Sequence, residues 1–338
     1  MSLYTDASLI MYPSGVKASK IYCQKPTDGS GDLTFSRAST ATYIDANGAR
    51  QTAASNVPRI DYTGGGCGKL LLEPQRTNLL LNSATLSTQN ITTTAQSYVL
   101  SFEGTGTVTL SGTYSGSLVG TGSTPADRVN LVFTATAGTL TATVSGTVSN
   151  AQIEAATYPT SYIPTAGSTV TRLADVTSSS LTSNGVWDGQ QGTVIFDVED
   201  NEPILGFISI SYTNRIFGDA SNYVGILQGI SGRVFFALVS GYSTFTSLGS
   251  DNRFKFAFTF DSTTVTTFLN GAKVNTTAKD IRAAMSLLYI STDRGQNWGI
   301  NSISLYDTIL SDVELEYLTG TSYNSYELMA ADLGYTVL

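Results

Sequence analysis

Three carboxylates lie in one short stretch of the sequence and could take part in glycoside hydrolysis. Asp197 and Glu199 occupy alternate positions of an apolar run, and Glu202 follows three residues later. Two carboxylates on either side of a glycosidic bond are the usual apparatus of that reaction. Strand alternation places Asp197 and Glu199 on one face, which Glu202 joins only through a bulge. The alternative is that Thr193, Asp197 and Glu199 form the solvated face of a half-buried strand.

A second group of residues has the chemistry of a sugar-binding loop. Sugar rings stack their C–H faces on aromatic side chains, and their hydroxyls need planar polar partners. The segment 293–298 supplies both kinds of group, and Tyr223 lies in another loop-like segment. The residues predicted to bind glycan are Trp298, Asp293, Arg294, Asn297 and Tyr223. The alternative makes Trp298 a core residue at the start of a strand and Arg294 an ion-pair partner of Asp293.

Metal and phosphate sites are not predicted. Asp219, Asn222, Asp293 and Asn301 carry oxygen ligands that calcium accepts, but they form no acidic loop of fixed spacing. The segment 64–69 is rich in glycine but lacks the Ser or Thr that follows the lysine of a phosphate loop. We therefore expect no metal and no cofactor.

The composition limits the classes of protein to which the chain could belong. The 338 residues are 41% hydrophobic and 13% charged, contain 32 glycines and no histidine, and carry a formal net charge of −8. Such a chain is expected to fold and to repel nucleic acid, and it lacks the usual general base and zinc ligand. Cys23 and Cys67 are predicted to be free thiols. We find no leader and no apolar run long enough for a membrane span, so neither is expected.

The elements that must position these residues are mostly strands. Residues 1–75 alternate short apolar runs with turns, and residues 76–175 show apolar and polar alternation typical of half-buried strands. Strands are expected again at 192–198, 254–260 and 265–269.

The last part of the chain carries sequence signals for a hairpin turn and for the start of a helix. Asn270 and Gly271 predict a tight hairpin turn of the type that needs positive φ twice. Ser311 and Glu314 predict a capping box at the start of a helix, and a second short helix is expected over 323–333.

Several of these segments resemble known families. The order of the aromatic strand, the turn at Asp261, the hairpin at Asn270 and the final strand and helix of 303–314 resembles a laminin-G-like, or concanavalin A-like, sandwich. That fold also hosts glucanases. The segments that resemble phage tail and host-specificity proteins are 32–42, 72–80, 151–154, 158–165 and 171–175. In those proteins the intervening module looks like a carbohydrate-binding jelly roll, and the resemblance implies a place in the virion.

The predicted architecture is all-β, with tandem antiparallel β-sandwiches (jelly rolls), a small N-terminal β segment and one or two short C-terminal helices. The expected divisions are a virion-attachment segment at 1–75, a carbohydrate-binding-like jelly roll at 76–175, a laminin-G-like sandwich at 176–322 and an extension at 323–338.

The predicted function is that of a non-enzymatic fibre or decoration subunit of a phage virion that adheres to host-surface glycan. Expected partners are other virion proteins, bound through the N-terminal segment, and further copies of the chain, with a trimer favoured. The alternatives are a polysaccharide depolymerase and a purely architectural subunit.

Overall fold

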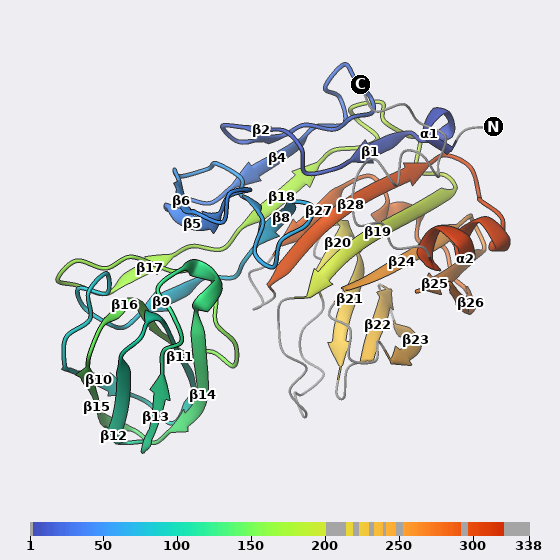
Figure 1. Ribbon diagram of the computed structural model, residues 1–338. Coiled ribbons are helices and arrows are strands. Elements are labelled where there is room, and N and C mark those ends of the chain that lie inside the picture. Colours follow the sequence, from blue (N-terminus) through green and yellow to red (C-terminus); the bar gives the residue numbers. More distant parts are fainter. Residues whose placement is uncertain are drawn as a thin grey trace.

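Short alternating runs separated by glycine-rich turns fold here into two antiparallel β-sandwiches (Figure 1). The computed structural model describes residues 3–200, 214–218, 223–229, 233–238, 241–247, 253–291 and 297–320. The all-β prediction, with antiparallel sandwiches and a short C-terminal helix, is confirmed. The predicted helix over 323–333 lies outside the described residues.

The larger sandwich, called the main sandwich below, has two sheets. In spatial order its first sheet contains β26 (Ala272–Ala278), β25 (Thr264–Leu269), β24 (Arg253–Phe260), β19 (Gly192–Asp200), β28 (Trp298–Tyr306), β8 (Lys69–Leu72) and β7 (Ile60–Asp61), with β1 (Leu9–Met11) also paired to β28. In spatial order its second sheet contains β2 (Val16–Lys17), β3 (Lys20–Ile21), β4 (Leu33–Ser36), β18 (Val176–Ser179), β27 (Leu288–Ser291), β20 (Asn214–Gly218), β21 (Tyr223–Gly229), β22 (Arg233–Leu238) and β23 (Gly241–Ser247).

The first 75 residues belong to this sandwich and are not a separate unit. The strand β1 pairs with β28, β8 pairs with the other end of β28, and β4 pairs with β18. Leu9, Phe35 and Leu70 share one buried core with Phe196 and Ile303. The prediction that residues 1–75 and residues 176–322 form separate units is therefore wrong. The two stretches fold as one sandwich, because neither buries both of its faces without the other.

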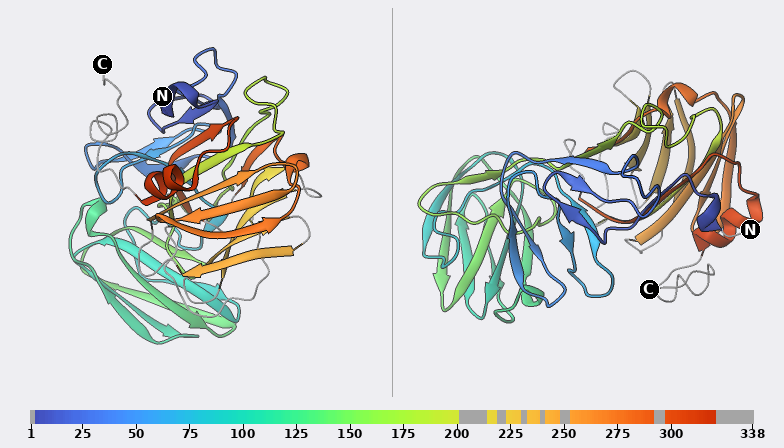
Figure 2. Two further views of the ribbon diagram at one scale, coloured as in Figure 1. Left: turned by 90° about the vertical axis from the view of Figure 1, so that its right-hand side faces the viewer. Right: turned by 90° about the horizontal axis from the view of Figure 1, so that it is seen from above.

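The smaller sandwich is inserted in the main one and is called the insert below. Its strands in spatial order are β10 (Gln89–Thr93), β15 (Gly138–Ser145), β12 (Thr107–Gly112) and β13 (Gly116–Val119) in one sheet, and β14 (Val129–Ala135), β11 (Gln96–Gly104) and β16 (Val148–Glu154) in the other. It has its own core, which includes Leu100, Phe102, Phe133 and Ile153. Figure 2 shows the insert as a body beside the main sandwich.

Two short strands join the two bodies. The chain leaves the main sandwich through β9 (Arg76–Asn78) and returns through β17 (Val170–Arg172), and these strands pair antiparallel. A hairpin of β5 (Ala41–Ile44) and β6 (Arg50–Ala53) lies near the same junction (Figure 1).

The predicted turn and cap are both present. Asn270 and Gly271 have φ values of 47° and 82°. The helix α2 (Asp312–Gly320) begins at a capping box in which the Ser311 backbone N–H donates to Glu314 at 2.8 Å and the Glu314 N–H donates to Ser311 Oγ at 3.3 Å. This helix covers the outer face of the first sheet, where Leu315 packs with Ile195 and Phe268.

The remaining helical turns are short: α1 (Leu3–Asp6), η1 (Pro125–Asp127) and η2 (Arg282–Ala284). Within the described ranges, no helix has the length and apolar character needed to cross a membrane.

Candidate functional site

A cluster of buried charges lies where the chain passes between the two bodies. Its members are Arg37, Arg59, Glu73, Arg172 and Asp175, and all are at most 1% exposed. Arg59 bridges the two acids, at 2.6 Å to Glu73 and 2.5 Å to Asp175, while Arg172 lies 2.8 Å from Glu73 and Arg37 lies 3.1 Å from Asp175. We call these five residues the junction cluster.

Ion pairs and hydrogen bonds satisfy most donors of the junction cluster, whereas the buried Nε atoms of Arg59 and Arg172 have no hydrogen-bond partner. The three guanidinium groups of the cluster outnumber its two carboxylates, and backbone carbonyls take up further donors. Arg37 donates to the carbonyls of Ser39, Ala54 and Val57, and Arg172 donates to that of Pro74 at 2.7 Å. Such compensation is what a buried charge requires.

Glu73 of the junction cluster stays ionised at neutral pH in spite of its burial. Burial alone would raise the pKa of Glu73, but the charges of Arg172 and Arg59 and hydrogen bonds from Ser161 lower this pKa to about 2. Desolvation disfavours the cation at Arg59, and the adjacent charges of Asp175 and Glu73 more than reverse this, so the pKa of Arg59 is raised. Glu73 and Arg59 therefore form an ion pair at neutral pH.

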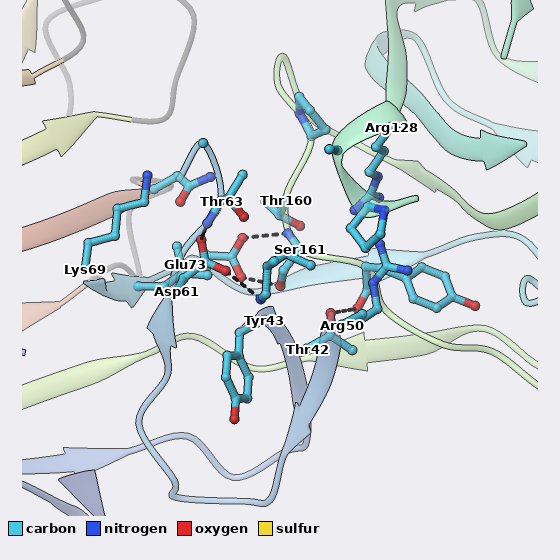
Figure 3. A pocket seen from close by; sticks show the side chains of 18 residues that line it. Thr42, Tyr43, Arg50, Asp61, Thr63, Lys69, Glu73, Arg128, Thr160 and Ser161 are labelled. Carbon is cyan, nitrogen blue, oxygen red and sulfur yellow. Dashed lines mark hydrogen bonds between the residues drawn. The ribbon is translucent and has the colours of Figure 1, made fainter. Parts of the chain in front are cut away.

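A pocket of about 440 Å³ opens beside the junction cluster, between the insert and the main sandwich. Its walls come from the β5–β6 hairpin, from β7 and β8, from the turn η1 of the insert and from residues 159–162. Figure 3 shows Lys69, Asp61 and Thr63 on one side of the pocket, Arg128 and Arg50 on the other, and Glu73 with Ser161 between them. We call it the junction pocket.

The aromatic groups of the junction pocket are Tyr43 and Tyr162. Tyr43 is half-buried, whereas Tyr162 is buried and its hydroxyl lies 2.7 Å from that of Ser83. The Arg50 guanidinium carbon stands 5.2 Å from the centre of the Tyr162 ring. Figure 3 shows the Tyr43 ring pointing away from the charged groups of the pocket, since Tyr43 alternates with Thr42 and Ile44 along β5.

The polar groups of the junction pocket differ in how fully they are bound. Arg50 forms a two-pronged ion pair with Glu103, and Lys69 lies 2.7 Å from Glu199. Asp61 accepts hydrogen bonds from the backbone N–H groups of Ile44 at 2.8 Å and Thr63 at 3.0 Å. Arg128 donates to the hydroxyl of Ser101 at 2.7 Å.

The five residues predicted to bind glycan are not brought together as a site. Asn297 lines the junction pocket and is 4% exposed. Trp298 is 8% exposed and packs edge-on against Phe254, with ring centres 6.4 Å apart, so it has the core placement of the alternative interpretation. Tyr223 begins β21, where its side chain is not described, and Asp293 and Arg294 lie outside the described residues.

The candidate catalytic carboxylates are held in ion pairs. Asp197 binds Arg253 through both oxygens, at 2.9 and 2.7 Å, and accepts a hydrogen bond from Asn301 at 3.1 Å. Glu199 binds Lys69, and Glu202 lies outside the described residues. The predicted solvated strand face is wrong for two of its three residues, because Thr193 is 0% exposed and Asp197 is 5% exposed, whereas the Glu199 side chain is 32% exposed.

The junction pocket was not predictable from the sequence, because its walls come from segments far apart in the chain. A signal was nevertheless present: the segments with the specific family resemblance supply Arg37, Glu73, Ser161, Arg172 and Asp175. These residues meet at the junction.

Comparisons with known proteins give structural matches to parts of this chain and no sequence match. No protein-family model and no curated protein sequence matches the chain. Among solved structures, the CBM40 of the Ruminococcus gnavus IT-sialidase, bound to α2,3-sialyllactose, has a TM-score of 0.30 and 14% identity, over 39% of this chain and 83% of that one.

Two further solved structures match smaller shares of their own chains. The binding domain of botulinum neurotoxin DC, in complex with rat synaptotagmin II, has a TM-score of 0.33 and 14% identity, over 43% of this chain and 40% of that one. The leech intramolecular trans-sialidase has a TM-score of 0.30 and 18% identity, over 40% and 24%. Each similarity covers less than half of this chain and concerns part of its fold.

Proposed function

We propose that this chain is a non-catalytic glycan-binding protein of a phage virion, a fibre or decoration subunit. The observation that carries the binding proposal is the junction pocket, which combines apolar wall with hydroxyl, amide and charged groups. Its volume of about 440 Å³ falls in the range of small-molecule sites.

The lining of the junction pocket suits a sugar ring. Pro125 and Pro159 form apolar wall for the C–H face of a sugar. Thr63, Asn297 and the ionised groups stand around these surfaces and supply hydrogen-bond donors and acceptors for hydroxyls. This combination favours a polar ligand with flat apolar faces.

The virion part of the proposal is supported by the sequence. Four of the five residues of the junction cluster lie in the segments that resemble phage tail and host-specificity proteins, and Arg59 is the exception. The 254–314 order of motifs resembles a laminin-G-like sandwich. Several copies on one particle would raise the effective concentration of a weak site, so we propose a homo-oligomer, with a trimer favoured.

Catalysis receives less support than binding. A carboxylate that acts as acid or nucleophile must face its substrate, whereas Asp197 is buried and held by Arg253. We expect Glu199→Gln to release the same amount of reducing sugar from host polysaccharide as the unaltered protein. Release that is present in the unaltered protein and lost in Glu199→Gln would instead favour the depolymerase.

The binding proposal is tested on an array of host-surface polysaccharides and oligosaccharides. We expect saturable binding, weakened about fivefold by Thr63→Val, since one hydrogen bond from an exposed lining hydroxyl contributes about 1 kcal/mol. Tyr22→Ala is the control, because Tyr22 is 42% exposed and does not line the pocket. A blank array would favour the architectural subunit.

The virion proposal is tested by immunogold electron microscopy of purified particles with an antibody to this protein. We expect label on the particle. Label at the tail tip favours receptor recognition, and label over the capsid favours a head fibre or decoration. Particles without label would overturn the virion proposal.

A further inference from the structure

Arg128 differs from the other cations of the junction pocket in its partners. It follows η1, a turn fixed where Thr124 N–H and Oγ1 donate to Asp127 at 3.0 and 2.7 Å. Its Nη2 donates to a neutral hydroxyl, that of Ser101, and its buried Nε has no hydrogen-bond partner. In the described part of the chain, no carboxylate forms an ion pair with this guanidinium.

The other charges in the junction pocket are already bound. Arg50 and Lys69 each form an ion pair, with Glu103 and Glu199. Glu73 accepts from Arg59 and from the Ser161 hydroxyl, the latter at 2.5 Å. Arg128 is therefore the lining cation whose charge is left for an added group.

The nearest acids do not take that place. Glu154 influences Arg128 through space, but its carboxylate accepts from the backbone N–H of Thr160 at 2.9 Å and from the Thr160 hydroxyl. Glu103 is bound by Arg50 and by Asn150 at 2.7 Å. Burial lowers the pKa of Arg128 and the charge of Glu154 opposes this, so the cation is poorly solvated.

We propose that the junction pocket binds an acidic sugar, a uronic or sialic residue, whose carboxylate pairs with Arg128 while Pro125 and Pro159 of the pocket wall contact the ring. This inference rests on the proposed glycan binding and adds the charge of the ligand. A guanidinium presents parallel donors that match a carboxylate, and a partly desolvated ion pair is stronger than one in water.

The test compares matched acidic and neutral probes by titration calorimetry. The pairs are oligogalacturonate with its carboxyl-reduced derivative, and 3′-sialyllactose with lactose. We expect at least one acidic probe to bind about tenfold or more tightly than its neutral partner, because a charged hydrogen bond is worth about 1.5–3 kcal/mol. This preference should shrink as sodium chloride is raised.

Variants of Arg128 assign the preference to one side chain. Arg128→Gln keeps a donor for Ser101 and removes the charge, so it should bind both members of a pair equally. Arg128→Lys keeps the charge and should retain part of the preference for the acidic probe. This variant provides the test if Arg128→Gln does not fold. Arg282→Gln is the control, since Arg282 pairs with Asp280 and does not line the pocket.

The outcomes separate this inference from the proposed function. Neutral probes that bind as tightly as acidic ones would overturn the acidic-sugar inference and leave glycan binding in place. An acidic preference that survives in Arg128→Gln would overturn the role of Arg128. If none of the four calorimetric probes binds, the acidic-sugar inference is contradicted. The proposed glycan binding is contradicted only if the polysaccharide array is also blank.

Discussion

At the scale of single residues, the junction cluster shows how a protein with few charges uses them. Removing one partner from a buried ion network leaves the other charge uncompensated, which costs more than the network itself contributes. Arg59 touches Glu73, Asp175, the Thr42 carbonyl and the Ser161 hydroxyl, and so joins the hairpin, the strand β8 and the chain that returns from the insert. The cluster thus fixes the relative placement of the two bodies.

We expect Glu73→Gln to lower the free energy of unfolding at pH 7 by about 3–5 kcal/mol, since it leaves Arg59 and Arg172 short of one buried negative charge. Urea denaturation at equilibrium measures this. Glu316→Gln is the control, because Glu316 is exposed on α2. Equal midpoints for the two variants would contradict the assigned role.

The same carboxyl makes stability depend on pH. The pKa of Glu73 is about 2 in the folded protein and 4.5 as an ordinary value. A lowered pKa stabilises the folded state fully above pH 4.5, and this contribution is lost as pH falls towards 2. The loss is about 3 kcal/mol. Unfolding free energies measured from pH 6 to pH 2.5 should fall more steeply for the unaltered protein than for Glu73→Gln, and parallel curves would contradict this.

The two thiols should react at different rates. Burial, followed by the charge of Asp32, raises the pKa of Cys23 to about 12, and its Sγ donates to the Gly31 carbonyl at 3.1 Å. Cys67 is exposed. A disulfide reagent at pH 8 should modify one thiol per chain rapidly, since the thiolate is the reactive form. Cys67→Ser should abolish that phase, and a fast phase that persists would contradict the assignment.

At the scale of elements, the hairpin between β25 and β26 and the helix α2 depend on each other. A Cβ at Gly271 would stand 3.0 Å from the Gly320 Cα. The Gly271 N–H also donates to the Thr319 hydroxyl at 3.0 Å. The turn is therefore selected for its backbone angle and for its contact with the end of the helix.

We expect Gly271→Ala to destabilise the protein by about 2 kcal/mol or more, because it adds a clash to the cost of positive φ, about 1–2 kcal/mol. Gly48→Ala is a matched control in another hairpin turn, with φ 77° and no atom within 4 Å of the new Cβ. It should show the strain alone. Thermal unfolding of both variants checks the difference, and equal losses would mean that the contact with α2 contributes nothing.

The elements were predictable to the extent that their signals are local. The turn at Asn270 and the capping box at Ser311 follow from neighbouring residues, and both are present. The burial of Thr193 was not predictable, because it depends on the segment between β28 and α2, more than a hundred residues later: Thr193 Oγ1 donates to the Thr308 carbonyl at 2.8 Å and accepts from the Leu310 N–H at 3.0 Å. Trp298 likewise lies in a core whose other members come from distant strands.

At the scale of the whole molecule, the insert interrupts the sequence of the main sandwich, so the two sandwiches do not follow one another along the chain. The all-β class followed from composition and alternation, but the pairing of β1 with β28 joins residues almost three hundred positions apart and leaves no local trace. The junction pocket has the same origin, since Arg50 and Arg128 approach it from different bodies. Long-range pairing set both features.

We expect a chain without residues 1–75 to fail to fold, because β1, β4 and β8 complete both sheets of the main sandwich. Residues 79–169 alone should fold, because the insert has its own core. Circular dichroism and urea unfolding of the two fragments measure this. A cooperative transition in the chain that begins at residue 76 would restore the attachment segment as an independent module.

The paired strands that join the bodies also bear on how such a gene can change. Asn78 and Val170 are direct partners across the β9–β17 ladder, so the two ends of the insert are adjacent in space. A genetic exchange that replaces the codons between them would graft another domain at this place with both joints already side by side. The rim of the pocket that Arg128 and Tyr162 supply would be replaced in the same event, while the rim from Tyr43 and Lys69 would be retained. One recombination would thus alter what is recognised without touching the scaffold that presents it.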